Sequence, residues 1–307
     1  MWNGKRFHSF DYDCKQRFGC KLYKLSLDAG FSCPNRDGTL DTRGCIFCSA
    51  GGSGDFAASR NLSITGQLSS ARQLVEAKNP SGKYIAYFQA FTNTYAPVEV
   101  LREKYLEAAS QQDIAALSVA TRPDCLSPAV VQLLSEINQL KPVTVELGLQ
   151  TIHAESARFI RRGYPLEIYE PAVHSLAAAG LDIVTHLILG LPNEYPGDML
   201  ASVRYISSLP LTGVKLQLLH VLAGTDLADY YRLHPENFHL LEMSDYIDTL
   251  PDCLAILPEQ IAVHRLTGDG PKKLLIAPLW SANKRLVLNT IEKEMKKRDF
   301  LQGQALK

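Results

Sequence analysis

Apolar segments of strand length recur along the chain, separated by stretches with helical periodicity. Residues 21–28 alternate apolar and polar side chains, and the five later segments are rich in aliphatic and aromatic residues. Such segments are typical of strands in a buried sheet. We therefore predict six strands, at residues 21–28, 84–91, 114–121, 143–150, 182–190 and 214–221.

Helical patterns lie between these strands. Residues 63–79 and 97–112 place apolar side chains on one helical face, and Ser127 followed by Pro128 is a typical helix start. Gly163 and Gly180 are expected to end helices. Because strands recur about every thirty residues with helices between them, the pattern predicts right-handed βαβ units and a parallel sheet.

The two faces of the predicted strands differ in polarity. Residues 143–150 carry only aliphatic side chains on one face, whereas the other face carries Thr144, Glu146, Gly148 and Gln150. Residues 214–221 likewise place Lys215 and Gln217 on one face. A doubly wound sheet would bury that polar face under helices, but a barrel turns it toward a lumen. We therefore expect an α/β fold, a partial (β/α)6 barrel with its site at the carboxyl ends of the strands.

The pattern changes after residue 221. Helices are predicted at residues 225–233, 243–257 and 283–298, with a short strand at 261–266. The chain has no linker rich in Gly, Ser or Pro that would separate this part as an independent domain. We expect an N-terminal arm (1–20), a barrel (21–225) and a small α-rich C-terminal extension packed on the barrel (226–307).

Composition limits the functional classes. With 46% hydrophobic and 21% charged residues the chain has an ordinary globular composition, and 32 basic residues balance 32 acidic ones. No overall field therefore indicates a nucleic acid or membrane partner. The first residues lack the apolar core of a signal peptide, and no apolar run approaches the roughly 20 residues that span a bilayer. We expect a cytoplasmic protein whose seven cysteines are reduced.

Three cysteines gather in a loop that is rich in Gly, Asn and Asp, which we call the cysteine loop (residues 33–48). Eleven residues separate Cys33 from Cys45, and two separate Cys45 from Cys48. The close pair suits one metal or one edge of a cluster. A structural zinc needs a fourth ligand. Spacing alone leaves an iron–sulfur cluster and zinc open, and the upstream candidates for a fourth zinc ligand are His8, Cys14 and Cys20.

Beyond the cysteines, a series of motifs resembles the radical SAM superfamily, and within it a YhcC-like family related to the catalytic subunit of Elongator. The superfamily usually has three residues in the first gap, whereas the eleven-residue gap, with Phe47 before the last cysteine, matches the narrower family. Arg43 departs from it, since the family more often has glycine there. The matching motifs are CPNRDGT (33–39), GSGDF (52–56), FQAFTNTYAP (88–97), TRPDCL (121–126), ELGLQT (146–151), RRG (161–163), THLILGLP (185–192), HRLTGD (264–269) and APLW (277–280).

The resemblance implies that Cys33, Cys45 and Cys48 hold a 4Fe-4S cluster, which cleaves S-adenosylmethionine to a 5′-deoxyadenosyl radical. Arg162 would bind the methionine carboxylate; a solvated helix charge is the alternative. His186 would bind ribose or be a core histidine. The implied S-adenosylmethionine contacts are Gln89, Thr92, Thr121, Glu146, Gln150, Arg162, His186 and Gly190.

Two of these residues have structural alternatives. A buried Glu146 requires a partner such as Lys215 or a ligand hydroxyl, and a structural ion pair would satisfy it. Gly190 would admit adenine or serve tight packing. The remaining cysteines, Cys14, Cys20, Cys125 and Cys253, are expected to be ordinary, although Cys125 follows the third strand and would face the site.

The same resemblance implies a tRNA substrate, with the carboxymethylaminomethyl group of a wobble uridine converted to aminomethyl, and a flavodoxin- or ferredoxin-like electron donor. Alternatives are a radical enzyme for a small metabolite or a protein, and a non-catalytic metal-binding module. Candidate substrate contacts are Asp55, Tyr95, Asp124, Lys215 and His220. Basic C-terminal residues would hold RNA phosphate or form a solvated face: His264, Arg265, Lys272, Lys273, Lys296, Lys297 and Arg298, beside Asp269.

Overall fold

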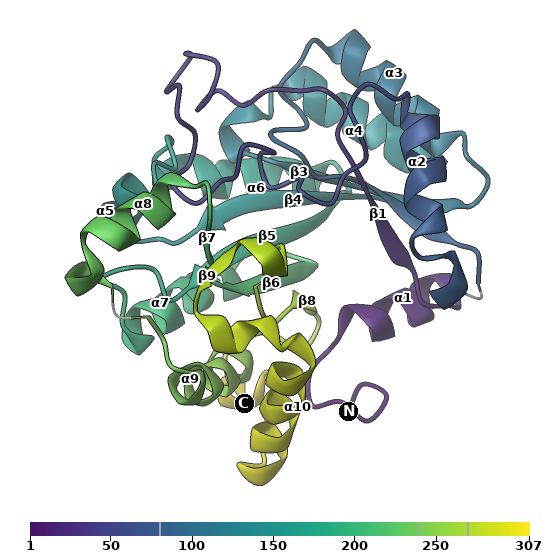
Figure 1. Cartoon of the computed structure of the whole chain (residues 1–307). Coiled ribbons are helices and arrows are strands. Elements are labelled where there is room, and N and C mark those ends of the chain that lie inside the picture. Colours follow the sequence, from purple (N-terminus) through teal and green to yellow (C-terminus); the bar gives the residue numbers. More distant parts are fainter. Residues whose placement is uncertain (80, 239, 269) are drawn as a thin grey trace.

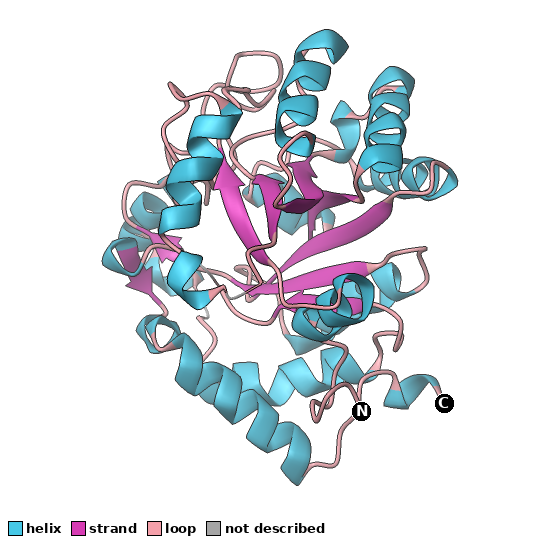
Figure 2. Ribbon diagram, turned by 90° about the vertical axis from the view of Figure 1, so that its right-hand side faces the viewer, coloured by secondary structure: helices cyan, strands magenta, loops and turns pink. Residues whose placement is uncertain are grey.

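The computed structural model describes residues 1–79, 81–238, 240–268 and 270–307. Within them, seven parallel strands form one sheet in the order β1-β2-β3-β4-β5-β6-β8, curled into a half-barrel (Figure 2). The predicted partial barrel is confirmed, with a seventh strand. The strands are β1 (Tyr23–Leu27), β2 (Tyr84–Phe88), β3 (Ile114–Thr121), β4 (Val143–Gln150), β5 (Asp182–Leu189), β6 (Gly213–Leu218) and β8 (Ala262–Arg265).

Helices connect the strands and lie outside the curled sheet (Figure 1). The predicted start at Ser127 is confirmed, because its Oγ accepts the Val130 N–H at 3.3 Å. The pattern at 63–79 was too long as one helix: α2 stops at Gln73, and a 3₁₀ turn follows. The connecting helices are α2 (Ile64–Gln73), α3 (Val98–Ala109), α4 (Pro128–Leu140), α5 (Ala154–Phe159), α6 (Tyr169–Ala178) and α7 (Pro196–Ser207).

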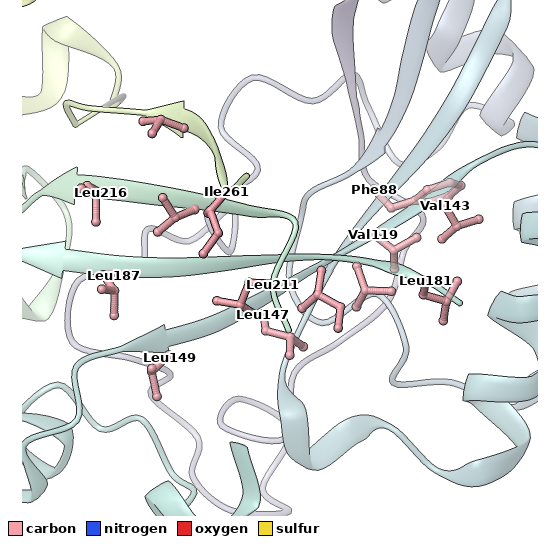
Figure 3. Close-up of a cluster of buried hydrophobic side chains, with 14 of the residues drawn as sticks. Phe88, Val119, Val143, Leu147, Leu149, Leu181, Leu187, Leu211, Leu216 and Ile261 are labelled. Carbon is pink, nitrogen blue, oxygen red and sulfur yellow. The ribbon is translucent and has the colours of Figure 1, made fainter. Parts of the chain in front are cut away.

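The core lies between the outer face of the sheet and these helices. Leu147 and Leu149 of β4 are fully buried there, as are Leu187 of β5 and Leu216 of β6 (Figure 3). Because neighbouring residues of a strand point to opposite faces, this packing turns the polar face of each strand into the lumen. The alternation seen in the sequence therefore places Glu146 and Lys215 inside the half-barrel.

The C-terminal part supplies strand β8 to the sheet and packs three helices beside it. Strand β7 (Val221–Leu222) pairs with β9 (Leu275–Ala277) in a separate two-stranded antiparallel sheet. Helices α8 (Asp226–Leu233), α9 (Met243–Ala255) and α10 (Lys284–Lys297) were all predicted, and α10 packs on α9 (Figure 1). The division at residues 225 and 226 stays a prediction.

The N-terminal arm contains a helix that the sequence pattern did not indicate, α1 (Phe10–Phe18). The His8 carbonyl accepts the Val263 N–H at 2.7 Å, so the arm runs along the outer edge of β8. No helix of the described ranges is long and apolar enough to cross a membrane. The 3₁₀ turns are Glu76–Lys78, Pro123–Cys125, Leu166–Ile168, Pro235–Asn237, Lys272–Leu274, Leu279–Ala282 and Gln304–Leu306.

Candidate active site

A cavity of about 260 Å³ lies at the carboxyl ends of the strands. Its wall is built from the cysteine loop, the lumenal side chains of the strands, and the segment from β6 to β8. All but one of the predicted cluster ligands and S-adenosylmethionine contacts line it. The lining residues among them are Cys33, Cys45, Cys48, Gln89, Thr92, Thr121, Glu146, Gln150, Arg162 and His186.

Asn35 fastens the cysteine loop to the turn that contains the RRG motif. Its Nδ2 donates to the carbonyls of Arg161 at 2.7 Å and Arg162 at 3.2 Å, and its side chain is buried. Gly163 lies against this amide with φ +80°, and a Cβ there would overlap Asn35 Oδ1. The prediction that Gly163 ends a helix is wrong, because α5 ends at Phe159. The missing side chain of Gly163 instead lets the two motifs approach each other.

The two thiols of the close pair interact directly. A hydrogen bond from Cys45 lowers the pKa of Cys48 to about 6, and the same interaction together with burial raises that of Cys45 well above its usual value. Ser53 Oγ lies 3.5 Å from Cys48 Sγ, and Asn35 Nδ2 lies 3.6 Å from Cys45 Sγ. Hydrogen bonds to sulfur are one way in which proteins tune iron–sulfur clusters.

The three thiols fit a cluster better than a single ion. Across the described ranges, no three Cys, His, Asp or Glu side chains are arranged to hold one metal ion. A cubane instead takes each thiolate at a different iron, and all three thiols line one cavity, as the ligands of a single cluster must. The upstream zinc candidates do not line this cavity: Cys14 is buried elsewhere, and His8 Nδ1 bonds to the Glu259 carbonyl at 3.1 Å.

Glu146 lies on the cavity floor, and five side chains from five other strands bond to its carboxylate. Oε1 accepts from Lys24 and from Ser118 at 2.6 Å. Oε2 accepts from Lys215, from Tyr87 at 2.9 Å and from His186 at 2.7 Å. The carboxylate is fully buried. The partner that a buried Glu146 requires is this network of protein side chains, which includes Lys215.

Charge in this network is set by burial and by the neighbouring cations. Burial opposes ionisation of Glu146, but Lys215 and Lys24 outweigh it and hold its pKa well below the usual value. Burial lowers the pKa of Lys215 to about 7, with Lys24 and Arg265 acting in the same direction and Glu146 opposing them. Burial and Lys215 lower the pKa of His186 to about 4, so His186 is neutral at pH 7.

Arg162 is buried and bonded to the backbone. Its Nη1 donates to the carbonyls of Thr151 at 2.7 Å and Leu149 at 3.2 Å, and its Nε donates to that of Tyr164 at 3.0 Å. The alternative of a solvated helix charge therefore does not describe it, since only 4% of the side chain is exposed. This geometry holds the end of β4 on the RRG turn, at the cavity wall.

Gln150 ends β4 in a strained conformation. Its φ is +70°, and the pairing with β5 shifts register between Gly148 and Gln150. Bulges at strand ends re-aim side chains. The carboxamide oxygen of Gln150 is buried and has no hydrogen-bond partner, although the residue lines the cavity.

The other predicted contacts take different roles in the ligand-free chain. Gln89 Nε2 donates to the Ser53 carbonyl at 2.8 Å and so holds the glycine-rich GSGDF segment. Thr121 Oγ1 lies 2.5 Å from Thr94 Oγ1, and Thr92 is buried. Gly190 does not line the cavity; its φ is +83°, and a Cβ there would meet Leu241, in agreement with the packing alternative.

Among the candidate substrate contacts, Asp55, Lys215 and His220 line the cavity. Tyr95, Asp124 and Cys125 line a second hollow instead, which the cysteine loop also borders through Pro34 and Leu40. Burial raises the pKa of Cys125 to about 12, as expected of an unreactive thiol.

The basic C-terminal residues are found in different settings. Of these, only Arg265 is part of the cavity wall, where its Nη1 donates to Gln217 Oε1 at 3.0 Å. Arg298 pairs with Asp252 of α9 at 2.9 Å. Asp269 lies outside the described residues.

Two arginines of the site were not singled out from the sequence. Arg36 lines the cavity, and its Nη2 donates to the carbonyls of Cys48 at 3.2 Å and Ser49 at 2.7 Å. Arg122 also lines it, and donates to Asp124 and, at 2.8 Å, to the Arg162 carbonyl. Both belong to motifs that match the family, CPNRDGT and TRPDCL. In each motif the arginine lies within three residues of a cysteine, and this spacing could have identified it.

Comparison with known proteins identifies the family. Residues 42–206, more than half of the chain, match the radical SAM superfamily, and residues 211–297 match the radical SAM C-terminal domain. The chain belongs to the radical SAM superfamily. Radical SAM enzymes bind a 4Fe-4S cluster and S-adenosylmethionine, and this chain is such an enzyme.

Its relatives place it in the YhcC-like, Elongator-related branch of the radical SAM superfamily. It is 44% identical to YtqA of Bacillus subtilis over 97% of this chain and 92% of YtqA. It is 38% identical to YhcC of Escherichia coli over 91% of this chain and 89% of YhcC.

Two further proteins are similar to part of this chain. The tRNA uridine(34) acetyltransferase of Methanocaldococcus jannaschii is 26% identical over 59% of this chain, which corresponds to 33% of that protein. The structure of archaeal Elp3 from Methanocaldococcus infernus superposes with a TM-score of 0.65 at 20% identity, covering 79% of this chain and 61% of Elp3. The structural match shows that the two chains share the fold.

Proposed function

We propose that this radical SAM enzyme modifies the wobble uridine of tRNA, converting its carboxymethylaminomethyl group at carbon 5 to aminomethyl. In this proposal Cys33, Cys45 and Cys48 hold the cluster, and the cavity between them and Glu146 receives S-adenosylmethionine and the target base. The bound cluster and S-adenosylmethionine would supply a 5′-deoxyadenosyl radical, and the chain would orient the base and exclude water.

The bond that breaks joins the amine nitrogen to the methylene of the carboxymethyl group. Loss of a hydrogen atom and an electron from that methylene, together with the proton on the nitrogen, gives an imine, which water hydrolyses to the aminomethyl base and glyoxylate. The hydrogen atom would leave in 5′-deoxyadenosine, and the bound cluster would take up the electron. Each conversion therefore consumes one S-adenosylmethionine and one water, and releases one glyoxylate.

The observation that carries this proposal is the relationship to a tRNA uridine(34) acetyltransferase, which spans 59% of this chain. The rim of the cavity supports it. Phe56 lines the cavity yet is 53% exposed, and Phe47 and the Arg36 guanidinium line it as well. Aromatic and guanidinium groups at a cavity mouth suit the stacking of an extruded nucleobase.

The deciding experiment uses the reconstituted enzyme and tRNA that carries carboxymethylaminomethyluridine. We expect aminomethyluridine, glyoxylate and 5′-deoxyadenosine in equal amounts, measured by mass spectrometry. Nucleosides from a deletion strain should show the complementary accumulation of the carboxymethylaminomethyl form. Wobble uridines that stay unchanged in both experiments, while S-adenosylmethionine is still cleaved, would leave the family intact and eliminate the tRNA substrate.

A variant series separates the cluster from the substrate. Cys48→Ala should lose iron and the cleavage of S-adenosylmethionine together, whereas Cys125→Ala, in the second hollow, should keep both. Phe56→Ala should raise the KM for tRNA and leave the slow cleavage without tRNA unchanged. If the substrate is instead a small metabolite or a peptide, tRNA will not compete with that substrate. Any effect of Phe56→Ala on its conversion will then be the same with and without RNA.

A further inference from the structure

Helix α8 of the C-terminal region contacts the cysteine loop through its first two residues. Asp226 Oδ2 accepts from Arg43 of the loop, whose Nη2 lies 2.8 Å and Nε 3.0 Å away. The same oxygen accepts from Arg161 of the RRG turn. The next residue, Leu227, donates its N–H to the Ile46 carbonyl at 2.8 Å. One helix start therefore holds the loop and the turn together.

Apolar packing of the segment between Cys45 and Cys48 reinforces the contact with α8. Ile46, which stands between Cys45 and Cys48, is buried in a cluster with Ile160, Leu227 and other aliphatic residues from β5, β7 and β9. The Ile46 N–H also donates to the Ile160 carbonyl at 3.1 Å. The position of Ile46 fixes the backbone that connects both thiols, so the docking of α8 bears on cluster geometry.

The charges at this contact are unequal, because two cations share one carboxylate. The hydrogen bond from Arg161 and the charges of Arg161 and Arg43 hold the pKa of Asp226 below its usual value against slight burial, so Asp226 is ionised at neutral pH. An isolated exposed ion pair contributes little to stability. Loss of Asp226 differs from loss of one such pair, since it leaves two guanidiniums facing each other.

We propose that Asp226 is a positioning residue for the cluster: through Arg43 and Arg161 it holds the Cys45–Cys48 half of the loop in its ligand-binding arrangement. The proposal rests on cluster binding by the three cysteines and is independent of the substrate. It also gives a reason for Arg43, which stands where the family more often has glycine. In this chain the loop arginine, Arg43, forms an ion pair with Asp226 of the C-terminal region.

Asp226→Asn tests this against a matched control, Asp229→Asn. Asp229 lies on the same helix, is exposed, and pairs at 3.1 Å with Arg232, away from the loop. In the cluster-free full chain, trypsin should cut after Arg36 and Arg43 faster in Asp226→Asn than in the control. In the reconstituted enzyme, iron release to a chelator should be about tenfold faster, within the range for groups that orient metal ligands.

A double variant shows whether charge is the cause. Arg43→Gln alone should have a small effect, because Arg161 still pairs with Asp226. Added to Asp226→Asn, it should slow iron release again, because it removes the repulsion between the two guanidiniums. Asp226→Glu should resemble the wild type in iron content and in the absorption spectrum of the cluster.

Three outcomes would overturn the proposal. One is iron release and cleavage by trypsin that are the same in Asp226→Asn and Asp229→Asn. Another is a double variant that is worse than Asp226→Asn. The third is a global loss of folding in Asp226→Asn, seen by circular dichroism, that Asp226→Glu shares, since this would mark a general structural role. None of these outcomes bears on the choice of tRNA as substrate.

Discussion

His186 Nε2 lies 2.7 Å from Glu146 Oε2, so that two residues singled out as ligand contacts bind each other in the ligand-free chain. The same oxygen accepts from Lys215 and Tyr87, and the other carboxylate oxygen accepts from Lys24 and Ser118. A carboxylate has about four lone-pair sites, and five donors fill them. Glu146 therefore acts by orienting the cavity floor, and His186 presents its remaining ring atoms to any ligand above.

We expect Glu146→Gln to destabilise the protein by about 3–5 kcal/mol, because it leaves the partly buried Lys24 and the buried Lys215 without an anion. Urea unfolding of the cluster-free protein measures the change. The control is Glu136→Gln, which removes a half-exposed ion pair with Arg102 and should cost about 1 kcal/mol or less. Equal effects of the two substitutions would contradict the network as a source of stability.

The pKa of Lys215 makes stability depend on pH. In the folded chain it is lowered to about 7, whereas the usual value is 10.5. Between these values the unfolded chain binds a proton that the folded chain has released, so this group adds stability as pH rises from 7 toward 10.5. The slope approaches about 1.4 kcal/mol per pH unit for one proton.

Lys215→Met should lack this contribution. The free energy of unfolding of the wild type minus that of the variant should therefore increase between pH 7 and pH 9.5, and chemical denaturation at several pH values measures it. Ionisations common to both proteins, such as those of the cysteines, cancel in the difference. A difference that stays constant or falls over this range would show that Lys215 keeps its ordinary pKa.

Gly163→Ala should impair cluster binding more than stability. A Cβ at Gly163 would overlap the Asn35 amide and push the cysteine loop away from the RRG turn. Gly180→Ala is a matched control, because Gly180 has a similar φ of +72° but open space around its Cβ position. Both variants carry the strain of a left-handed alanine, about 1–2 kcal/mol.

Iron per chain after anaerobic reconstitution distinguishes the two glycines. Gly180→Ala should reach the wild-type content despite a lower melting temperature, and Gly163→Ala should fall well short of it. Equal iron contents in the two variants would mean that the approach of Asn35 to Gly163 has no part in cluster binding.

The fold could be predicted from the sequence because apolar and polar residues alternate along the strands. Glu146 and Lys215 stood on the polar face of segments whose other face was wholly aliphatic, and that pattern predicted the lumen. The pattern could not predict which side chains of distant strands contact each other across the lumen. Lys24 lies on the first strand, and its reach to Glu146 on the fourth depends on how tightly the sheet curls.

The loops were predictable as motifs but not as structures. Asn35 and Gly163 are 128 positions apart, and nothing local to either residue indicates that one amide would occupy the space of a missing side chain. Helix α1 was missed because its polar residues give only a weak apolar face, in which Cys14 is the buried residue. The strand at 261–266 was found, but its place in the sheet depends on tertiary packing.

Arg162→Lys separates two roles for the arginine. Its guanidinium donates to the buried carbonyls of Leu149, Thr151 and Tyr164, and a lysine ammonium on a flexible stem lacks the planar fork that reaches all three. We expect the cluster-free protein to lose about 1–3 kcal/mol, the cost of unsatisfied buried acceptors. Arg158→Lys, at an exposed position on α5, should change stability little.

Binding of S-adenosylmethionine to the reconstituted Arg162→Lys enzyme, measured by equilibrium dialysis, completes the comparison. If Arg162 acts by holding the end of β4, affinity should fall together with stability, and a second-site change that restores stability should restore affinity. If Arg162 binds the methionine carboxylate directly, affinity should fall while the unfolding free energy stays at the wild-type value. The three carbonyl partners of Arg162 favour the first outcome.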